Sequence, residues 1–114
     1  MSAEPVTETG WTLVCQVDDI ACGTVAQAEV DGRVIALARD AEGVFHALDD
    51  RCTHGAVSLS EGEVEGCMLE CWLHGSRFDL RTGQPSGPPA IIPVAVFPVK
   101  VEGDDVFVDV VSTR

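Results

Sequence analysis

Two short cysteine–histidine pairs are the residues of this chain with the clearest capacity for chemistry. The first pair is Cys52 and His54, and the second is Cys71 and His74. Sixteen residues separate the pairs, and a glycine directly follows each histidine. Thiolate sulfur and imidazole nitrogen are ligands for transition metals, and glycine lets the backbone approach a bound group closely. The pairs therefore predict one metal centre with four protein ligands.

The mixing of cysteine and histidine within each pair distinguishes between kinds of metal centre. Structural zinc sites usually space two cysteines as C-x₂₋₄-C and two histidines as H-x₃₋₅-H, and the mixed pairs fit that spacing poorly. Two sulfurs could instead hold one iron of a binuclear cluster, and two imidazoles the other. A structural zinc module is the alternative, and it would be colourless, whereas the iron–sulfur form would be red-brown.

The segments around the pairs carry a resemblance to a known family. The first segment reads RCTHGAV, and the second reads CWLHGSRFDLRTG. These segments resemble the cluster-binding loops of Rieske proteins, and among them the small ferredoxins of bacterial aromatic-ring-hydroxylating dioxygenase systems. The resemblance implies one Rieske 2Fe-2S cluster per chain, with Cys52 and Cys71 on one iron and His54 and His74 on the other.

The resemblance also implies a one-electron carrier in aromatic hydrocarbon catabolism, and not an enzyme. Such a carrier would take electrons from a flavoprotein ferredoxin reductase and pass them to a terminal oxygenase. Oxygenases of this kind need a further iron, usually held by two histidines and a carboxylate, and the two pairs leave only His46. We expect His46 to face outward from a strand. The alternative function is a small redox subunit of another complex, similar to the small subunit of nitrite reductase.

Four positions bear on the reduction potential that the resemblance implies. High-potential Rieske proteins join their two loops by a disulfide, but the matching positions here are Val57 and Leu73. Those proteins also place a tyrosine hydroxyl near a ligand sulfur, where this chain has Phe78. Ser76 either donates a hydrogen bond to a bridging sulfide or caps a turn. We therefore expect a potential below zero, nearer about −150 mV than about +300 mV.

Length, hydropathy and charge narrow the class of protein. The 114 residues, 46% of them hydrophobic, predict a single domain over 1–114. No apolar run approaches the length of about 18 residues that would predict a membrane span, and the first residues lack the basic and apolar segments of a secretory signal. The net charge of −12 disfavours nucleic acid as a partner. We expect a cytoplasmic monomer.

The acidic charge also has a possible use in recognition, beyond solubility. Opposite charge speeds encounter without making a complex long-lived, so we expect brief docking on basic patches of larger redox proteins. The sequence does not say which acidic residues would form the docking face. Candidates are spread over the chain and include Glu42, Asp49, Asp50, Glu61, Glu63, Glu65, Glu70, Asp104 and Asp105.

Three cysteines lie outside the two pairs. Cys15 sits in an apolar, alternating run and reads as a small hydrophobic residue in a reducing compartment. A disulfide between Cys15 and Cys22 is the alternative. Cys67 completes the set, and its redox state is open at this point.

Apolar runs that tend to alternate, separated by turn signals at short intervals, predict strands. We expect strands at 11–17, 25–30, 33–39, 44–48, within 63–70, and at 77–80, 94–101 and 106–110. These runs predict an all-β chain. The resemblance implies the architecture: a Rieske-like antiparallel β sandwich with a small cluster-binding subdomain inserted at about 52–80, and a proline-rich cover loop at about 85–90.

Overall fold

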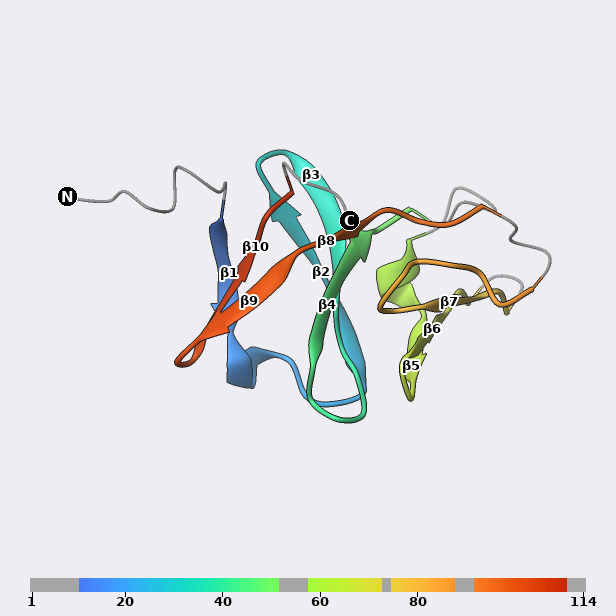
Figure 1. The fold of residues 1–114 in the computed structure, drawn as a ribbon, viewed down its shortest axis with the longest axis horizontal. Coiled ribbons are helices and arrows are strands. Elements are labelled where there is room, and N and C mark those ends of the chain that lie inside the picture. The colour runs from blue at the N-terminus through green and yellow to red at the C-terminus, as the bar shows by residue number, and fades with distance from the viewer. Residues whose placement is uncertain (1–10, 52–57, 73–74, 88–91, 111–114) are drawn as a thin grey trace.

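A computed structural model describes residues 11–51, 58–72, 75–87 and 92–110 of the chain (Figure 1). The described residues form short strands and two 3-10 turns. The strands are β1 (Thr12–Gln16), β2 (Thr24–Val30), β3 (Arg33–Arg39), β4 (Phe45–Asp49), β5 (Glu63–Glu65), β6 (Met68–Glu70), β7 (Arg77–Asp79), β8 (Val96–Phe97), β9 (Val99–Glu102) and β10 (Asp105–Val108). The 3-10 turns are η1 (Val17–Asp19) and η2 (Leu59–Glu61).

The strands form three antiparallel sheets. Strands β2, β3, β4 and β8 make a central sheet, β1, β10 and β9 make a second, and β5, β6 and β7 make a third. Figure 1 shows the central sheet between the other two, with β5–β7 on the opposite side from β1, β9 and β10. The prediction of an all-β, antiparallel fold is confirmed. No described helix is long and apolar enough to cross a membrane.

The hairpin of β2 and β3 shows how local sequence sets this frame. Asp31 and Gly32 both adopt positive φ, at 52° and 79°, which is the backbone of the tight hairpin turns that match strand twist. The strands pair without interruption from Val30↔Arg33 to Thr24↔Arg39. The strands predicted at 25–30 and 33–39 are therefore confirmed, with β2 one residue longer than expected.

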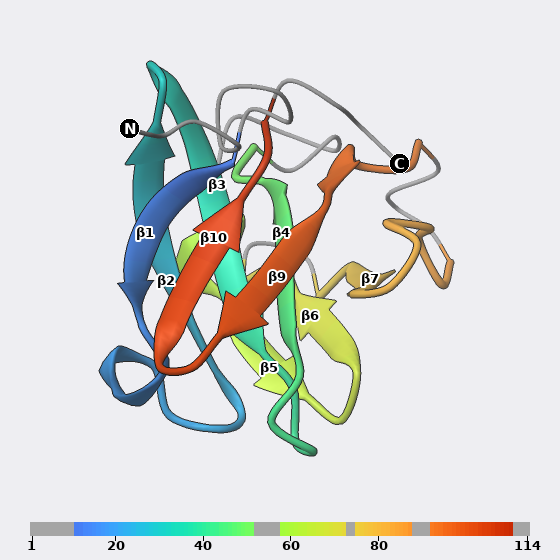
Figure 2. The same cartoon turned by 60° about the vertical axis from the view of Figure 1, so that its left-hand side comes forward.

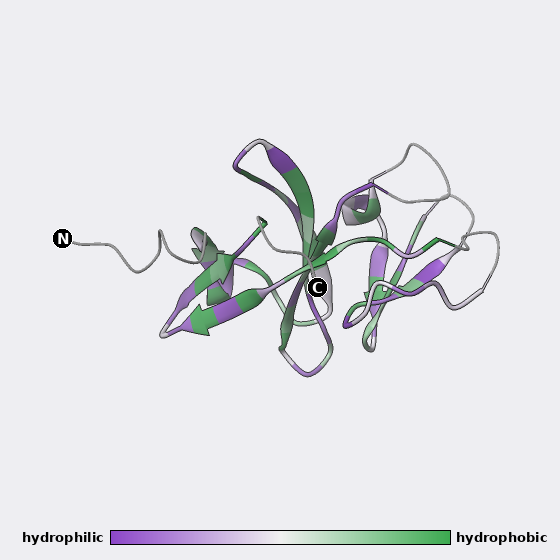
Figure 3. Cartoon of the chain, turned by 45° about the horizontal axis from the view of Figure 1, so that its top comes forward, coloured by the Kyte–Doolittle hydropathy of each residue, from purple (hydrophilic) through white to green (hydrophobic). Residues whose placement is uncertain are grey.

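The central sheet is buried on both faces. Ile35 and Leu37 of β3 enter one hydrophobic core, which β1, β9 and β10 complete. Ala36 and Ala38 point the other way, because successive side chains of a strand alternate, and they enter a second core with residues of the β5–β7 unit. Figure 3 shows hydrophobic stretches in strands of all three sheets. The small alanine side chains let the β5–β7 unit pack closely on the sheet.

The expected single strand at 94–101 is wrong, because the chain changes sheets there. β8 pairs with β4, whereas β9 pairs with β10, and Figure 2 shows these last two strands side by side. Pro98 lies between them and has no N–H to donate to a ladder, while its carbonyl accepts a hydrogen bond from the N–H of Asp109 at 3.1 Å. The proline therefore marks a crossing point between two sheets and not a bulge within one strand.

Candidate metal centre

The second ligand loop begins at Cys71, directly after β6. The N–H of Cys71 donates to the carbonyl of Ser76 at 2.7 Å, and the carbonyl of Cys71 accepts from the N–H of Gly75 at 3.0 Å. Gly75 has φ 75°, in the region that side-chain-bearing residues rarely adopt. These bonds close a narrow neck with Cys71 on one side and Ser76 on the other. Both residues are buried.

The neck of the first ligand loop is fixed by an aspartate. Arg51 and Ser58 form an isolated antiparallel bridge on either side of residues 52–57. Asp50, which is only 4% exposed, accepts hydrogen bonds from the Gln27 side chain and from the N–H of Ser60, each at 2.7 Å. Sequence reasoning grouped Asp50 with the acidic surface. The structure corrects this, because Asp50 ties the loop to β2 and η2.

A third loop leaves the same unit after β7. Pro85 forms an isolated bridge with Phe78, which places the start of the proline-rich segment beside the strand that follows the second ligand loop. Gly83 has φ 79° and lies so close to the carbonyl of Val94 that a Cβ would collide with it. The N–H of Gly83 donates to the carbonyl of Asp79 at 2.7 Å and closes the turn after β7. Residues 88–90 of the predicted cover loop lie outside the described residues.

Of the four predicted ligands, the structure describes Cys71. Cys52, His54 and His74 lie outside the described residues. Leu59, which follows the first neck, packs in the same hydrophobic core as Cys71 and Phe78, so the two ligand loops leave one small packed unit. A buried thiol in a glycine-containing turn suits a metal centre, because a thiolate needs its charge compensated away from water.

Comparison with known proteins decides the kind of centre. Residues 10–98 match the family described as the Rieske [2Fe-2S] domain. The chain belongs to this family. Its cofactor is a Rieske 2Fe-2S cluster, and the zinc alternative loses its support. The donor set fits this cofactor, since Rieske clusters take two cysteines and two histidines and the described cysteine is placed to contribute one thiolate.

Three relatives define the branch of the Rieske family that this chain resembles. It is 41% identical over 100 residues to the biphenyl dioxygenase ferredoxin subunit of Pseudomonas sp. (strain KKS102), covering 87% of this chain and 91% of that one. It matches the ferredoxin of carbazole 1,9a-dioxygenase from Nocardioides aromaticivorans IC177 with a TM-score of 0.82 and 31% identity, covering 87% and 96% of the two chains. It also matches a chain in the complex of reduced oxygenase and oxidized ferredoxin in carbazole 1,9a-dioxygenase, with a TM-score of 0.80, 36% identity and coverage of 89% and 94%.

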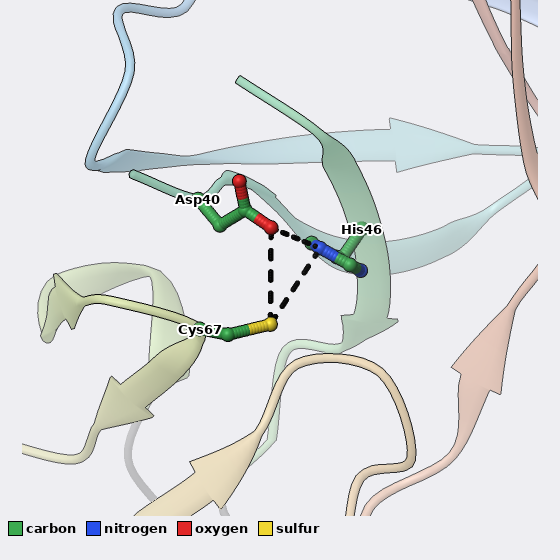
Figure 4. A group of neighbouring side chains, drawn as sticks. All are labelled: Asp40, His46 and Cys67. Atoms are coloured by element: carbon green, nitrogen blue, oxygen red, sulfur yellow. Dashed lines mark hydrogen bonds and ion pairs between the residues drawn. The ribbon is translucent and has the colours of Figure 1, made fainter. Parts of the chain in front are cut away.

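The remaining histidine of this Rieske chain is not where the sequence predicted. The side chain of His46 is only 11% exposed and lies on the face of β4 that turns toward the β5–β7 unit. Its Nε2 atom lies 2.9 Å from Oδ2 of Asp40 and 4.0 Å from Sγ of Cys67 (Figure 4). The expectation of an outward-facing histidine is wrong, because a third sheet covers what would otherwise be the outer face.

The carboxylate of Asp40 is held from several sides. Its Oδ1 atom accepts hydrogen bonds from the N–H groups of Glu42 at 2.9 Å and Val44 at 3.0 Å, while Oδ2 faces His46. Burial raises the pKa of Asp40, but the hydrogen bonds from His46 and from the backbone outweigh burial and hold the pKa below its usual value. Asp40 therefore stays ionised in the folded protein at neutral pH.

Proposed function

We propose that this protein is the ferredoxin of a bacterial ring-hydroxylating oxygenase system. It carries one electron at a time from a flavin-dependent NAD(P)H reductase to a terminal oxygenase. The observation that carries the proposal is the match to a dioxygenase ferredoxin subunit over 87% of this chain and 91% of that subunit. The match to a chain of an oxygenase–ferredoxin complex supports the oxygenase as a partner.

We further propose that Cys52 and Cys71 hold one iron and that His54 and His74 hold the other. When bound, the cluster supplies a site that accepts and returns one electron at a potential above that of an all-cysteine cluster. The protein positions and shields it. The neck at Cys71 and the neck below Asp50 support both loops, and the buried Phe78 and Ser76 line the unit that bears them.

A redox titration of the purified protein, with electron paramagnetic resonance of the reduced form, tests this assignment. We expect mixed nitrogen and sulfur ligation and a midpoint below zero, nearer about −150 mV than about +300 mV. Phe78 supports the low value, because it brings no hydroxyl to the cluster. A clearly positive midpoint would contradict the expectation.

The variant His74→Cys tests the ligand assignment separately. A thiolate adds negative charge to the first shell, so the variant should retain its cluster poorly or move the midpoint toward the value of about −400 mV for all-cysteine clusters. The control is His46→Gln, which changes a histidine that lies in the separate contact with Asp40. An unchanged midpoint in His74→Cys would show that His74 is not a ligand.

The unit that carries Cys71 also offers a docking surface. Trp72 is 53% exposed and, together with Glu61, Glu63 and Glu70, lines a shallow hollow of about 250 Å³. An exposed aromatic ring among acidic groups suits a basic partner surface with an apolar centre. We propose that the reductase and the oxygenase dock in turn on this face, which we call the Trp72 face.

Electron transfer from the reductase at increasing salt concentration tests the Trp72 face. The rate should fall as salt rises, because screening shortens the range of the acidic surface. The double variant Glu61→Gln/Glu63→Gln should reduce both the rate and its salt dependence. The matched control, Glu102→Gln/Asp104→Asn, removes the same charge from the exposed β9–β10 turn and should leave the rate nearly unchanged. Equal effects of the two double variants would refute the docking proposal.

The cysteines outside the cluster support a reducing compartment. Cys15, Cys22 and Cys67 are free thiols in the structure, and free thiols persist where glutathione and thioredoxin keep them reduced. We therefore propose a cytoplasmic location and, as from the sequence, a monomer. A mass measurement of the purified protein tests the second point. Stable co-purification with a large enzyme would favour the alternative of a redox subunit of another complex.

A further inference from the structure

We propose that Asp40, His46 and Cys67 form a second metal site, separate from the cluster, which binds one divalent cation of the zinc class. A carboxylate oxygen, an imidazole nitrogen and a cysteine sulfur are the three donor types that bind zinc in proteins. The residues come from the end of β3, from β4 and from the turn between β5 and β6, and Figure 4 shows their side chains converging. Sequence reasoning missed the site, because no motif spacing links the three residues.

The distances between the donor atoms suit one ion. Oδ2 of Asp40 lies 2.9 Å from Nε2 of His46 and 3.8 Å from Sγ of Cys67, and Nε2 lies 4.0 Å from Sγ. Tetrahedral zinc with bonds of about 2.0–2.3 Å requires its ligand atoms to be roughly 3.3–3.7 Å apart. The three observed distances bracket that range, so small side-chain rotations would place all three donors around a cation.

The site is held in place by backbone hydrogen bonds that do not use Oδ2 of Asp40, Nε2 of His46 or Sγ of Cys67. Asp40 uses Oδ1 for the N–H groups of Glu42 and Val44, which leaves Oδ2 pointing at the other two donors. The N–H of Ala41 donates to the carbonyl of Gly66 at 3.2 Å, which ties the β3–β4 turn to the turn that carries Cys67. Hydrogen bonds that orient ligands in this way are a regular feature of metal sites.

The three donors line a hollow that gives a cation access and leaves room for water. The hollow has a volume of about 370 Å³ and is also lined by Glu42 and Arg81. Three protein ligands with a water in the fourth position is a common zinc arrangement. Glu42 adds negative charge at the rim. Arg81 opposes a cation, but its side chain is 68% exposed and pairs with Asp79 at 3.3 Å, so part of its charge is compensated.

Cation binding would also change the protonation of the site, because Asp40, His46 and Cys67 are all ionisable. Burial is the largest influence on the thiol of Cys67 and raises its pKa, an effect that the charge of Arg81 partly offsets. A bound zinc-class ion stabilises the thiolate and displaces the proton. The site should therefore bind its ion more tightly as pH rises.

Calorimetric titration of the fully cluster-loaded protein with Zn²⁺ tests the proposal. We expect one equivalent to bind, with no change in iron content or in the visible absorption of the cluster. Cys67→Ser and His46→Gln should each weaken binding by more than about 10-fold, since loss of even a second-shell partner costs about 10–100-fold. The control Cys22→Ser removes an exposed thiol elsewhere and should bind as the parent protein does.

Two results of the calorimetric titration would overturn the proposal. One is the absence of a Zn²⁺ equivalent at millimolar concentration in protein whose cluster is intact. The other is binding that Cys67→Ser and His46→Gln leave unchanged. A second probe, Co²⁺, guards against a variant that fails to load its cluster: the parent protein should gain a sulfur-to-cobalt absorption band that disappears in Cys67→Ala. A band that persists in Cys67→Ala would also refute the site. Because neither readout uses electron transfer, the site and the proposed ferredoxin function can fail independently.

Discussion

The two faces of the central sheet are built in different ways. Toward β1, β9 and β10 the sheet presents large side chains, such as Ile35, Leu37 and Phe97, which are almost completely buried. Toward the β5–β7 unit β3 presents only Ala36 and Ala38, while Leu48 of β4 and Leu69 of the unit itself fill that core. The first face meets three strands of four or five residues each, whereas the second meets three strands of three residues each.

This difference indicates that one side of the protein mainly stabilises the fold, whereas the other side carries the cluster-binding loops. The β1, β9 and β10 side is an ordinary sandwich core whose burial drives folding. The β5–β7 unit is too small to be stable by itself, because three-stranded pieces need a packed face or another tie. The unit packs on the face of the central sheet that bears Ala36 and Ala38, and a bound cluster would join the loops of the unit. We expect the first side to fold without the cofactor and the second side to depend on it.

Removal of a ligand should produce the largest effect and separate the two sides. Cys71→Ser should abolish cluster retention and leave the β5–β7 unit poorly ordered, because the thiolate ties the loop to the iron. Hydrogen exchange should then be fast in β5–β7 and remain slow in β2–β4. The control Cys22→Ser should keep its iron and its slow exchange. Fast exchange throughout the Cys71→Ser protein would show that the two sides fold as one.

Matched cavities in the two cores should give the next largest effect. Leu37→Ala should lower the free energy of global unfolding by about 2–5 kcal/mol, the usual cost of emptying a buried leucine site, and should leave cluster retention nearly unchanged. Leu69→Ala removes the same atoms from the other core and should instead speed loss of the cluster. Denaturant unfolding and the decay of visible absorption measure the two effects. Equal changes in unfolding free energy and in the rate of cluster loss for the two variants would show that the two cores do not have separate roles.

A pair of glycine variants tests the close approach of Gly83 to the carbonyl of Val94. Gly83→Ala should destabilise the protein by about 1–3 kcal/mol, because it combines positive φ with a collision against the carbonyl of Val94. Gly23→Ala has nearly the same φ, 80° against 79°, but open space around the new Cβ. It should cost only the backbone strain. Equal losses on urea unfolding would mean that the contact with Val94 relaxes freely.

The smallest effect should appear in the pH dependence of stability. The pKa of Asp40 is lowered in the folded protein, so its stabilising contribution is complete above its unfolded pKa of about 3.9 and is lost as pH falls through the lower folded value. Asp40→Asn should therefore lose less unfolding free energy than the parent protein on acidification below about pH 4. The two proteins should be compared with the cluster bound and without added Zn²⁺. Parallel plots of unfolding free energy against pH would show that Asp40 does not contribute in this way.

Local signals in the sequence predicted most of the fold. Arg33–Arg39 lies between two turn signals, Asp31-Gly32 and the turn that ends at Gly43, and the strand appears with the predicted bounds. The split at Pro98 was not predictable from the pattern, because a run of apolar residues does not say which sheet each half joins. The short motif around the cysteine–histidine pairs identified the family, which the hydrophobic periodicity of the chain could not have done.

Residues that act across the fold were harder to predict. Asp50 was expected among the surface charges, and no sequence signal gave Asp40 a role, but both are buried and hold turns in place. His46 read as outward-facing, since alternation along a strand does not reveal a third layer. Cys67 lies 27 residues from Asp40 and 21 from His46. Their meeting depends on how the β5–β7 unit packs, and no local pattern encodes that.

The change of sheets at Pro98 has a consequence for how the chain can be divided. β8 is the last strand of the central sheet, and β9 belongs to the sheet of β1, β9 and β10. The chain therefore connects these two sheets directly at Pro98. A truncation that ends before residue 96 would take away strands from both layers at once. Residues 96–108 therefore hold the two sheets of the sandwich together. A shorter fragment designed to bind the cofactor must still include these residues.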